Sequence, residues 1–186
     1  MTKLYYTWQE FDRDVCELAT QMQRDGWFPD YIVGITRGGL ALAASLSNRL
    51  GVPCQTLKVS LRDGTDCESN LWMAEDAFGT VPPEEQAMYK SRWDTARRKN
   101  ILIVDDINDS GATLNWIKED WESGCFPNER NTWDTVWNHN VRFATLFDNT
   151  ASAFTAVDYT VNEINKLEKD VWIVFPWEKQ FLELSR

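Results

Sequence analysis

The chain has 186 residues, of which 43% are hydrophobic and 13% aromatic, which is enough for one domain with a substantial core. Its formal net charge of −10 argues against nucleic acid or an anionic membrane as the main partner. No apolar run approaches the roughly 20 residues of a membrane-spanning helix, the N-terminal segment lacks the apolar core of a signal peptide, and the cysteines form no CxxC pair, so we expect a cytoplasmic protein with reduced thiols.

The first expected element is an amphipathic helix over Trp8–Arg24, where apolar residues recur at helical spacing. Thr7 precedes it as a capping residue, and Glu10 follows three positions later, which is the pattern of a capping box. We expect this helix to be part of the scaffold.

A short apolar strand is expected over Tyr31–Thr36, and it runs into Arg37, Gly38 and Gly39 before a helix over residues 40–50. Two glycines allow the backbone to approach a ligand closely, and a guanidinium can bind an anion through two hydrogen bonds. Taken alone, this pattern is also compatible with an ordinary strand-to-helix turn.

A third strand is expected over residues 55–60, with Lys58 and Ser60 at its end as candidates for contacting a substrate. Residues 61–100 are the least regular part of the chain and include a mixed-charge helix expected over residues 84–99, whose basic end is expected to be solvated. A long excursion between two core strands is either functional or a surface insertion, and both interpretations stay open here.

The most informative stretch is ILIVDDINDSGATL, residues 101–114. Its apolar half predicts a strand buried on both faces, and Ser110 and Gly111 precede a helix expected to begin at Ala112. A strand, a tight loop and a helix N-terminus make an anion site, because backbone N–H groups and the helix dipole converge there. We therefore expect a phosphate to bind at this loop.

Three carboxylates lie beside the expected phosphate site, those of Asp105, Asp106 and Asp109. Carboxylates repel a phosphate unless hydroxyls or cations intervene, so the ligand is expected to bring sugar hydroxyls, a Mg²⁺ ion or both. At the carboxyl edge of a parallel sheet, Asp105 and Asp106 can both reach the ligand crevice. Asp109, inside the loop, is placed to exchange a proton with a ligand.

The remaining segments continue the alternation of strand and helix. Residues 123–140 are turn-rich and are expected to be an insertion, with the single histidine, His139, on a polar surface loop. Strands are expected over residues 141–147, 156–162 and 171–175, the second of them at an edge. The pattern indicates an α/β fold with a central, mainly parallel sheet flanked by helices.

The stretch from Asp105 to Thr113 resembles the signature of the type I phosphoribosyltransferases, in which two acidic residues precede a D-[ST]-G-x-T loop. The resemblance implies binding of phosphoribosyl pyrophosphate (PRPP), a flexible hood over residues 61–100, Asp105 and Asp106 at the ribose hydroxyls and Mg²⁺, and Asp109 as the catalytic proton acceptor. The residues that it assigns to the 5-phosphate are Asp109, Ser110, Gly111, Ala112 and Thr113. Thr36 to Gly39 resemble the pyrophosphate loop of the purine-salvage branch, with the residues Thr36, Arg37, Gly38 and Gly39. The first peptide bond of that loop is often cis in the family.

The C-terminal stretch DVWIVFPWE, residues 170–178, resembles the base-binding segment of xanthine–guanine and hypoxanthine phosphoribosyltransferases. The resemblance implies that residues 148–186 form a small base-recognition part. It places Trp172 against the purine face and Ile173 in backbone contact with the base, and it makes Glu178 a further candidate for Mg²⁺. Aromatic stacking suits a flat base.

One position departs from that family. There, a lysine follows the strand that matches residues 144–147, and it donates to the purine 6-oxo group. This chain has Asp148 and Asn149 instead. An aspartate repels a carbonyl oxygen, whereas Asn149 can donate to a base or accept from it.

Together, these resemblances imply one Mg²⁺-dependent phosphoribosyltransferase domain over residues 1–186, which transfers the phosphoribosyl group of PRPP to guanine, xanthine or hypoxanthine and assembles as a homodimer or homotetramer. Two alternatives stay open: a PRPP- or nucleotide-binding regulator without catalysis, and a transferase that acts on a base other than a 6-oxopurine. A kinase-like nucleotide enzyme is disfavoured, because the sequence has no GxxxxGK[ST] motif.

Overall fold

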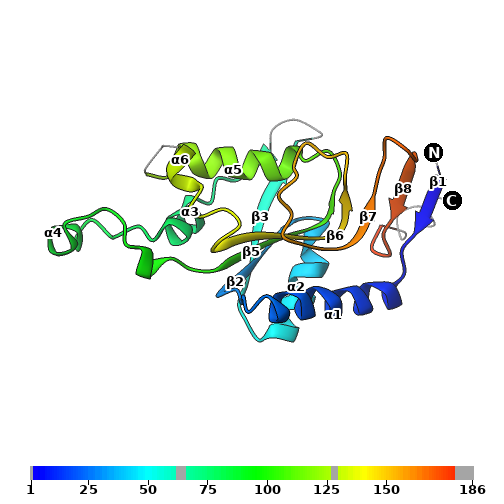
Figure 1. Ribbon diagram of the computed structural model, residues 1–186, viewed down its shortest axis with the longest axis horizontal. Coiled ribbons are helices and arrows are strands. Elements are labelled where there is room, and N and C mark those ends of the chain that lie inside the picture. The colour runs from blue at the N-terminus through cyan, green and yellow to red at the C-terminus, as the bar shows by residue number, and fades with distance from the viewer. Residues whose placement is uncertain (1, 62–65, 127–129, 179–186) are drawn as a thin grey trace.

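The computed structural model describes residues 2–61, 66–126 and 130–178, and it is built around a six-stranded sheet with the order β4-β3-β2-β5-β6-β7 (Figure 1). Neighbouring strands run parallel except β3 and β4, which are antiparallel. The strands are β2 (Tyr31–Thr36), β3 (Cys54–Ser60), β4 (Asp66–Cys67), β5 (Ile101–Asn108), β6 (Val141–Asn149) and β7 (Tyr159–Ile164). The expected mainly parallel α/β sheet is confirmed, and β7 lies at one of its two edges.

Helices cover both faces of the sheet (Figure 1). On one face lie α1 (Trp8–Arg24) and α2 (Gly39–Leu50), and on the other lie α3 (Leu71–Phe78), α5 (Ala112–Gly124) and the short α6 (Arg130–Trp133). The side chains of β5 alternate between the two resulting cores: Ile101 and Ile103 join the second face, and Leu102 and Val104 join the first. This double burial accounts for the uninterrupted apolar run that precedes Asp105.

Helix α1 begins as expected from its capping box. The Thr7 hydroxyl accepts a hydrogen bond from the Glu10 backbone N–H at 3.2 Å, and the Glu10 carboxylate accepts one from the Thr7 N–H at 2.8 Å. Helix α2 ends at Gly51, whose positive φ of 69° gives it a left-handed cap. Both helices are confirmed within one residue of their expected bounds.

The prediction of a single helix over residues 84–99 is wrong. Its place is taken by α4 (Gln86–Tyr89) and a 3-10 turn (Thr95–Arg97), on a segment that lies at the opposite end of the molecule from the strand of residues 171–174 (Figure 1). The basic residues there are not a solvated helix end, because they tie this segment to its neighbours. Arg97 pairs with Glu85 at 2.6 Å, and Lys99 pairs with Asp76 at 3.0 Å.

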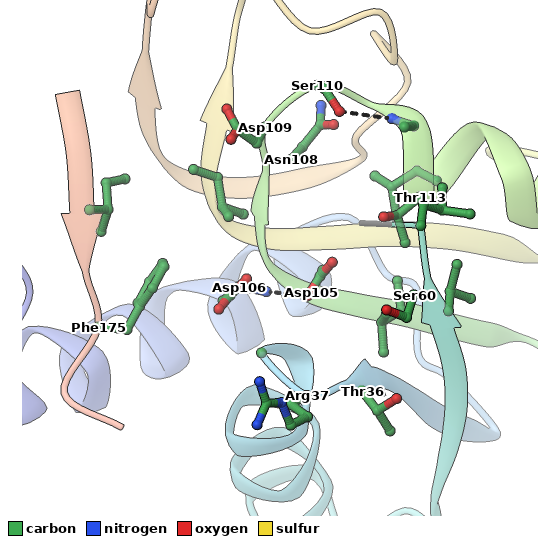
Figure 2. A pocket seen from close by; sticks show the side chains of 18 of the residues that line it. Thr36, Arg37, Ser60, Asp105, Asp106, Asn108, Asp109, Ser110, Thr113 and Phe175 are labelled. Atoms are coloured by element: carbon green, nitrogen blue, oxygen red, sulfur yellow. Dashed lines mark hydrogen bonds between the residues drawn. The ribbon is translucent and has the colours of Figure 1, made fainter. Parts of the chain in front are cut away.

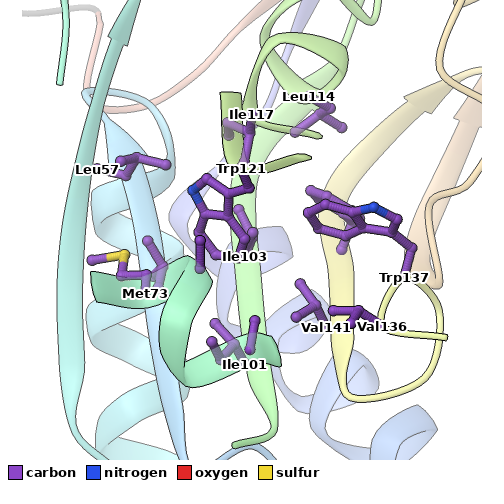
Figure 3. Close-up of a cluster of buried hydrophobic side chains, with 14 of the residues drawn as sticks. Leu57, Met73, Ile101, Ile103, Leu114, Ile117, Trp121, Val136, Trp137 and Val141 are labelled. Carbon is purple, nitrogen blue, oxygen red and sulfur yellow. The ribbon is translucent and has the colours of Figure 1, made fainter. Parts of the chain in front are cut away.

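The described part of residues 123–140, which we expected to be an insertion, contributes side chains to the core, and its status as an insertion stays a prediction. Trp133, Val136 and Trp137 are buried in the core on the α5 face, where Trp121 and Trp137 stack with ring centroids 5.7 Å apart (Figure 3). The segment therefore completes the core, although turn residues dominate its sequence. His139 is exposed, as expected.

A second, two-stranded sheet lies apart from the main sheet, beyond its β7 edge (Figure 1). It pairs β1 (Thr2–Tyr5), which the sequence analysis missed, in parallel with β8 (Val171–Val174). Strand β8 forms where a strand was expected over residues 171–175, but it lies outside the main sheet. None of the helices in the described ranges is long and apolar enough to cross a membrane.

Candidate active site

A cavity of about 1200 Å³ opens where β2, β3 and β5 end, and residues of β8 and the turn after it line its far side (Figure 2). Ligands of open α/β sheets bind at the carboxyl ends of the strands, which is where this cavity lies. Both loops that the sequence analysis singled out contribute to its lining, Thr36 to Gly38 from one and Asp105 to Thr113 from the other. A single ligand can therefore touch both.

The Arg-Gly-Gly loop lies directly against the acidic pair. A Cβ atom built on Gly38 would lie 2.5 Å from the Asp106 Cγ and 2.6 Å from its Oδ1, so no side chain fits there without displacing the carboxylate. The Thr36–Arg37 peptide bond is cis, as the resemblance led us to expect. Arg37 is exposed at the mouth of the cavity, so its guanidinium is accessible to an anion.

Gly39, which we assigned to the same loop, is buried and is absent from the lining of the cavity. A Cβ atom there would collide with the backbone of β5, at 3.1 Å from the Asp105 Cα. Its small size allows the first turn of α2 to pack against β5. Gly39 therefore positions the loop.

Asp105 and Asp106 sit at the point where β5 turns into its loop. The Asp105 carboxylate accepts a hydrogen bond from the Asp106 backbone N–H at 2.9 Å (Figure 2). Burial raises the pKa of Asp106 to about 6, and the negative charge of Glu178 adds to this rise, whereas the N–H of Ile107 acts in the opposite direction. A ligand that brings hydroxyls or a cation to this pair would stabilise its ionised form.

The loop that follows is shaped for close contact with an anion. Gly111 has a positive φ of 82°, and a Cβ atom there would lie 2.7 Å from the Ser152 Oγ and collide with the backbone of Phe154. The Ser110 carbonyl oxygen accepts a hydrogen bond from the N–H of Ala153 at 3.1 Å. The loop is therefore held from behind by residues 152–154, while residues 109–113 face the cavity.

Asn108 is the centre of that support, and the sequence analysis assigned it no role. It is buried, and its amide donates to the Asp148 Oδ1 at 2.7 Å and to the Phe154 carbonyl oxygen at 2.8 Å. Its Oδ1 accepts from the Ser152 hydroxyl at 2.9 Å. Asp148, which stands where the family's lysine is found, thus holds Asn108 and does not line the cavity.

Asn149, which we expected at the base, does not line the cavity either. Its side chain is buried, and its amide donates to the Asp109 carbonyl oxygen at 2.8 Å. Its Oδ1 accepts from the backbone N–H groups of Ala151 at 3.2 Å and Lys166 at 3.1 Å. These bonds place Asn149 behind the phosphate loop, where it joins that loop to the turn after β7.

Lys166 is a charged lining residue that the sequence analysis missed. Its Nζ lies 2.8 Å from the Oδ1 of Asp109, and it comes from the turn between β7 and β8. No motif marks it, since it stands in a stretch of ordinary polar turn residues. Of the β3 candidates, Ser60 lines the cavity and Lys58 does not.

Trp172 and Ile173 of β8 also line the cavity, and their contact with a base stays a prediction. The Trp172 side chain is 40% exposed, so its ring is accessible to a flat ligand. Phe175 and Trp177 also line the cavity, and their rings stack with centroids 5.0 Å apart and nearly parallel planes. Of the expected hood, Leu61 lines the cavity and α3 is packed in the core; residues 62–65 lie outside the described ranges, and the hood stays a prediction.

The described ranges contain no group of three or more His, Cys, Asp or Glu residues that could hold a metal ion by themselves. Mg²⁺ is commonly bound by one or two carboxylates together with ligand phosphates. Asp105 and Asp106 fit that requirement, because both are carboxylates, both line the cavity and they are adjacent at the end of β5. Glu178 also lines the cavity, and its carboxylate accepts a hydrogen bond from the Phe175 N–H at 3.4 Å.

Comparison with known proteins gives a consistent result. A family model described as "Phosphoribosyl transferase domain" matches residues 1–181. The xanthine-guanine phosphoribosyltransferase of Cereibacter sphaeroides is 28% identical over 190 residues, which cover 98% of this chain and 92% of that protein. That of Idiomarina loihiensis is 23% identical, with 95% of this chain and 87% of that protein covered.

Solved structures agree in fold. The purine phosphoribosyltransferase of Pyrococcus horikoshii is 26% identical with a TM-score of 0.61, and 96% of each chain is covered. The Helicobacter pylori xanthine-guanine-hypoxanthine phosphoribosyltransferase has the same TM-score at 22% identity, with 98% of this chain and 97% of that chain covered. At this identity, the similarity supports a shared fold only.

Proposed function

The chain belongs to the phosphoribosyl transferase family, and on that premise we propose that it transfers the 5-phosphoribosyl group of PRPP to a purine base and releases pyrophosphate. The observation that carries this proposal is the shared cavity: the loop that begins at the cis Thr36–Arg37 peptide and the loop of residues 109–113 line the same space. The purine class is supported by relatives named xanthine-guanine phosphoribosyltransferase.

PRPP carries a 5-phosphate at one end and a pyrophosphate at C1 of the ribose, so it needs two anion sites separated by groups that bind hydroxyls. Residues 109–113 supply backbone N–H groups at the start of α5 for the 5-phosphate. Arg37 and the backbone of Gly38 supply the second anion site. Asp105 and Asp106 lie between the two loops, where they would accept hydrogen bonds from the ribose hydroxyls.

The reaction exchanges one bond at C1 of the ribose for another. A ring nitrogen of the base forms a bond to C1, the bond from C1 to the pyrophosphate oxygen breaks, and positive charge builds on the ribose in between. The nitrogen-bound proton of the base passes to the Asp109 carboxylate. General base catalysis of this kind typically contributes about 10²–10⁴-fold.

We propose Mg²⁺ as the cofactor, held by Asp105 and Asp106 together with oxygens of PRPP, with Glu178 as a further candidate. When bound, the ion would neutralise charge on the leaving pyrophosphate. A cytoplasmic location and a homodimeric or homotetrameric assembly stay predictions drawn from the family resemblance.

The direct test is to incubate the protein with PRPP, Mg²⁺ and a panel of bases, and to measure pyrophosphate release. The proposal expects release with at least one of guanine, xanthine and hypoxanthine, and none when the base is omitted. Tight PRPP binding without release for any base would overturn the proposal in favour of a PRPP-binding regulator. The Asp109→Asn variant controls for a contaminating activity, because its PRPP binding should persist while release falls.

A further inference from the structure

The cavity is strongly acidic, and its cations are few. Asp105, Asp106, Asp109 and Glu178 line it, and among the described lining residues the cationic side chains are those of Arg37 and Lys166. Arg37 stands at the Arg-Gly-Gly loop, where the proposed pyrophosphate would lie. Lys166 stands at the other loop, paired with Asp109. One cation thus stands beside the carboxylate that is proposed to take the proton of the base.

Lys166 is held in place by its backbone and by the turn around it. Its N–H donates to the Asn149 Oδ1 at 3.1 Å, and the N–H of Thr150 donates to the Ile164 carbonyl oxygen at 2.8 Å. The side chain of Asn165 accepts from the N–H of Leu167 at 3.0 Å. These bonds join the turn after β7 to the end of β6, so the Lys166 side chain starts from a fixed point and is only 22% exposed.

The partner of Lys166 is the residue proposed to take the proton of the base. The Lys166 ammonium and the Asp109 carboxylate lie 2.8 Å apart, so they present a donor and an acceptor side by side. In a 6-oxopurine, O6 and N7 lie side by side on one edge of the base. In the tautomer that carries its proton on N7, this edge offers a carbonyl acceptor beside an N–H donor, which is the complement of the pair.

On the premise of the proposed function, we infer that Lys166 is the residue that selects the base: its ammonium donates to the exocyclic oxygen of a 6-oxopurine while Asp109 accepts the N7 proton. N9 then forms the bond to C1 of the ribose, the bond to pyrophosphate breaks, and the N7 proton moves to Asp109, so charge and protons balance. The inference rests on the 2.8 Å pair and on the lining of the cavity, to which Lys166, Asp109, Trp172 and Ile173 all contribute.

This placement predicts discrimination against adenine. An amino group at C6 is a donor, and an ammonium has no acceptor to offer it, so the two donors would face each other. A site built around a hydrogen bond rejects ligands that cannot make it, because its own polar group is left unpaired. The selection is thus supplied by a residue of the β7–β8 turn, while Asp148 is occupied with Asn108.

The test compares two bases that differ at the 6-oxo group, hypoxanthine and unsubstituted purine. For the unmodified protein and for Lys166→Met, kcat/KM is measured with each base, and PRPP affinity is measured without base. We expect the unmodified protein to prefer hypoxanthine, and Lys166→Met to lower kcat/KM for hypoxanthine about 10- to 100-fold while that for purine changes less than threefold. PRPP affinity should stay within about threefold.

The matched control is Lys169→Met, which removes the same charge from an exposed position in the same turn. It should leave the ratio between the two bases unchanged. If Lys166→Met lowers the rate with both bases by the same factor, or changes neither, Lys166 does not read the 6-oxo group and the inference fails while the proposed function stands. If none of the bases tested makes the unmodified protein release pyrophosphate, the proposed function fails, and the inference fails with it.

Discussion

The carboxylate of Asp106 occupies the space that a side chain at Gly38 would need: a Cβ atom there would lie 2.5 Å from the Asp106 Cγ. The two residues are far apart in the sequence and belong to different motifs. Their contact places the Arg-Gly-Gly loop next to the acidic pair at the end of β5. The substitutions below test this and the other relationships on which the site depends.

Gly38→Ala should displace the Asp106 carboxylate and weaken PRPP binding at least tenfold, because the added methyl group and the carboxylate cannot share one position. Isothermal titration with PRPP and Mg²⁺ measures this. The control is Gly51→Ala, where a Cβ atom meets nothing within 4 Å but φ is 69°. That change should lower the melting temperature and leave PRPP affinity intact. Equal PRPP affinity in Gly38→Ala and the unmodified protein would disprove the contact's importance.

Asp109→Asn should reduce kcat about 10²–10⁴-fold and change PRPP affinity by less than a few-fold, because an amide cannot accept the base proton but keeps the shape of the loop. Steady-state pyrophosphate release measures the first effect, and equilibrium titration measures the second. An unchanged kcat would remove Asp109 from the chemical step.

Asn108→Ala should lower the free energy of unfolding by about 2–3 kcal/mol, because it removes three hydrogen bonds of a buried side chain, those to Asp148, Phe154 and Ser152. Urea denaturation followed by tryptophan fluorescence measures the change. Ser152→Ala removes one of these bonds and should cost about 1 kcal/mol. A cost for Asn108→Ala no larger than that for Ser152→Ala would show that the network does not support the loop as described.

Trp133→Ala should lower the free energy of unfolding by about 3–5 kcal/mol, because Trp133 is fully buried and packs against Phe78 and Trp137. The control in the same segment is His139→Ala, an exposed position where the change should stay within about 0.5 kcal/mol. Urea denaturation of both variants decides the point. Similar small costs for both variants would contradict a core role for Trp133.

Local pattern was enough to predict the framework of the fold. The apolar run before Asp105, the capping box at Thr7 and the glycine at position 51 each follow from short-range rules, and each was found where it was expected. The two loops were predictable for the same reason, since each is a strand, a small-residue turn and a helix start in direct succession.

The rest depends on contacts between distant residues, which no local pattern encodes. Strand β1 is four residues long and forms only because β8 lies beside it. Trp133 and Trp137 are core residues in a segment that its turn residues mark as a loop. Lys166 reaches Asp109 because Asn149 anchors its backbone, and Asp148 is occupied by Asn108. These are consequences of tertiary packing.

The central claim is that one PRPP molecule spans the two loops, with its pyrophosphate at Arg37 and its 5-phosphate at residues 109–113. The most direct measurement is the affinity of Arg37→Gln for PRPP and for ribose 5-phosphate, which lacks the pyrophosphate, in the presence of Mg²⁺. The account predicts that PRPP binds about 10- to 100-fold more weakly than to the unmodified protein, while ribose 5-phosphate binds equally well to both. Equal losses for the two ligands, or no loss for PRPP, would contradict it.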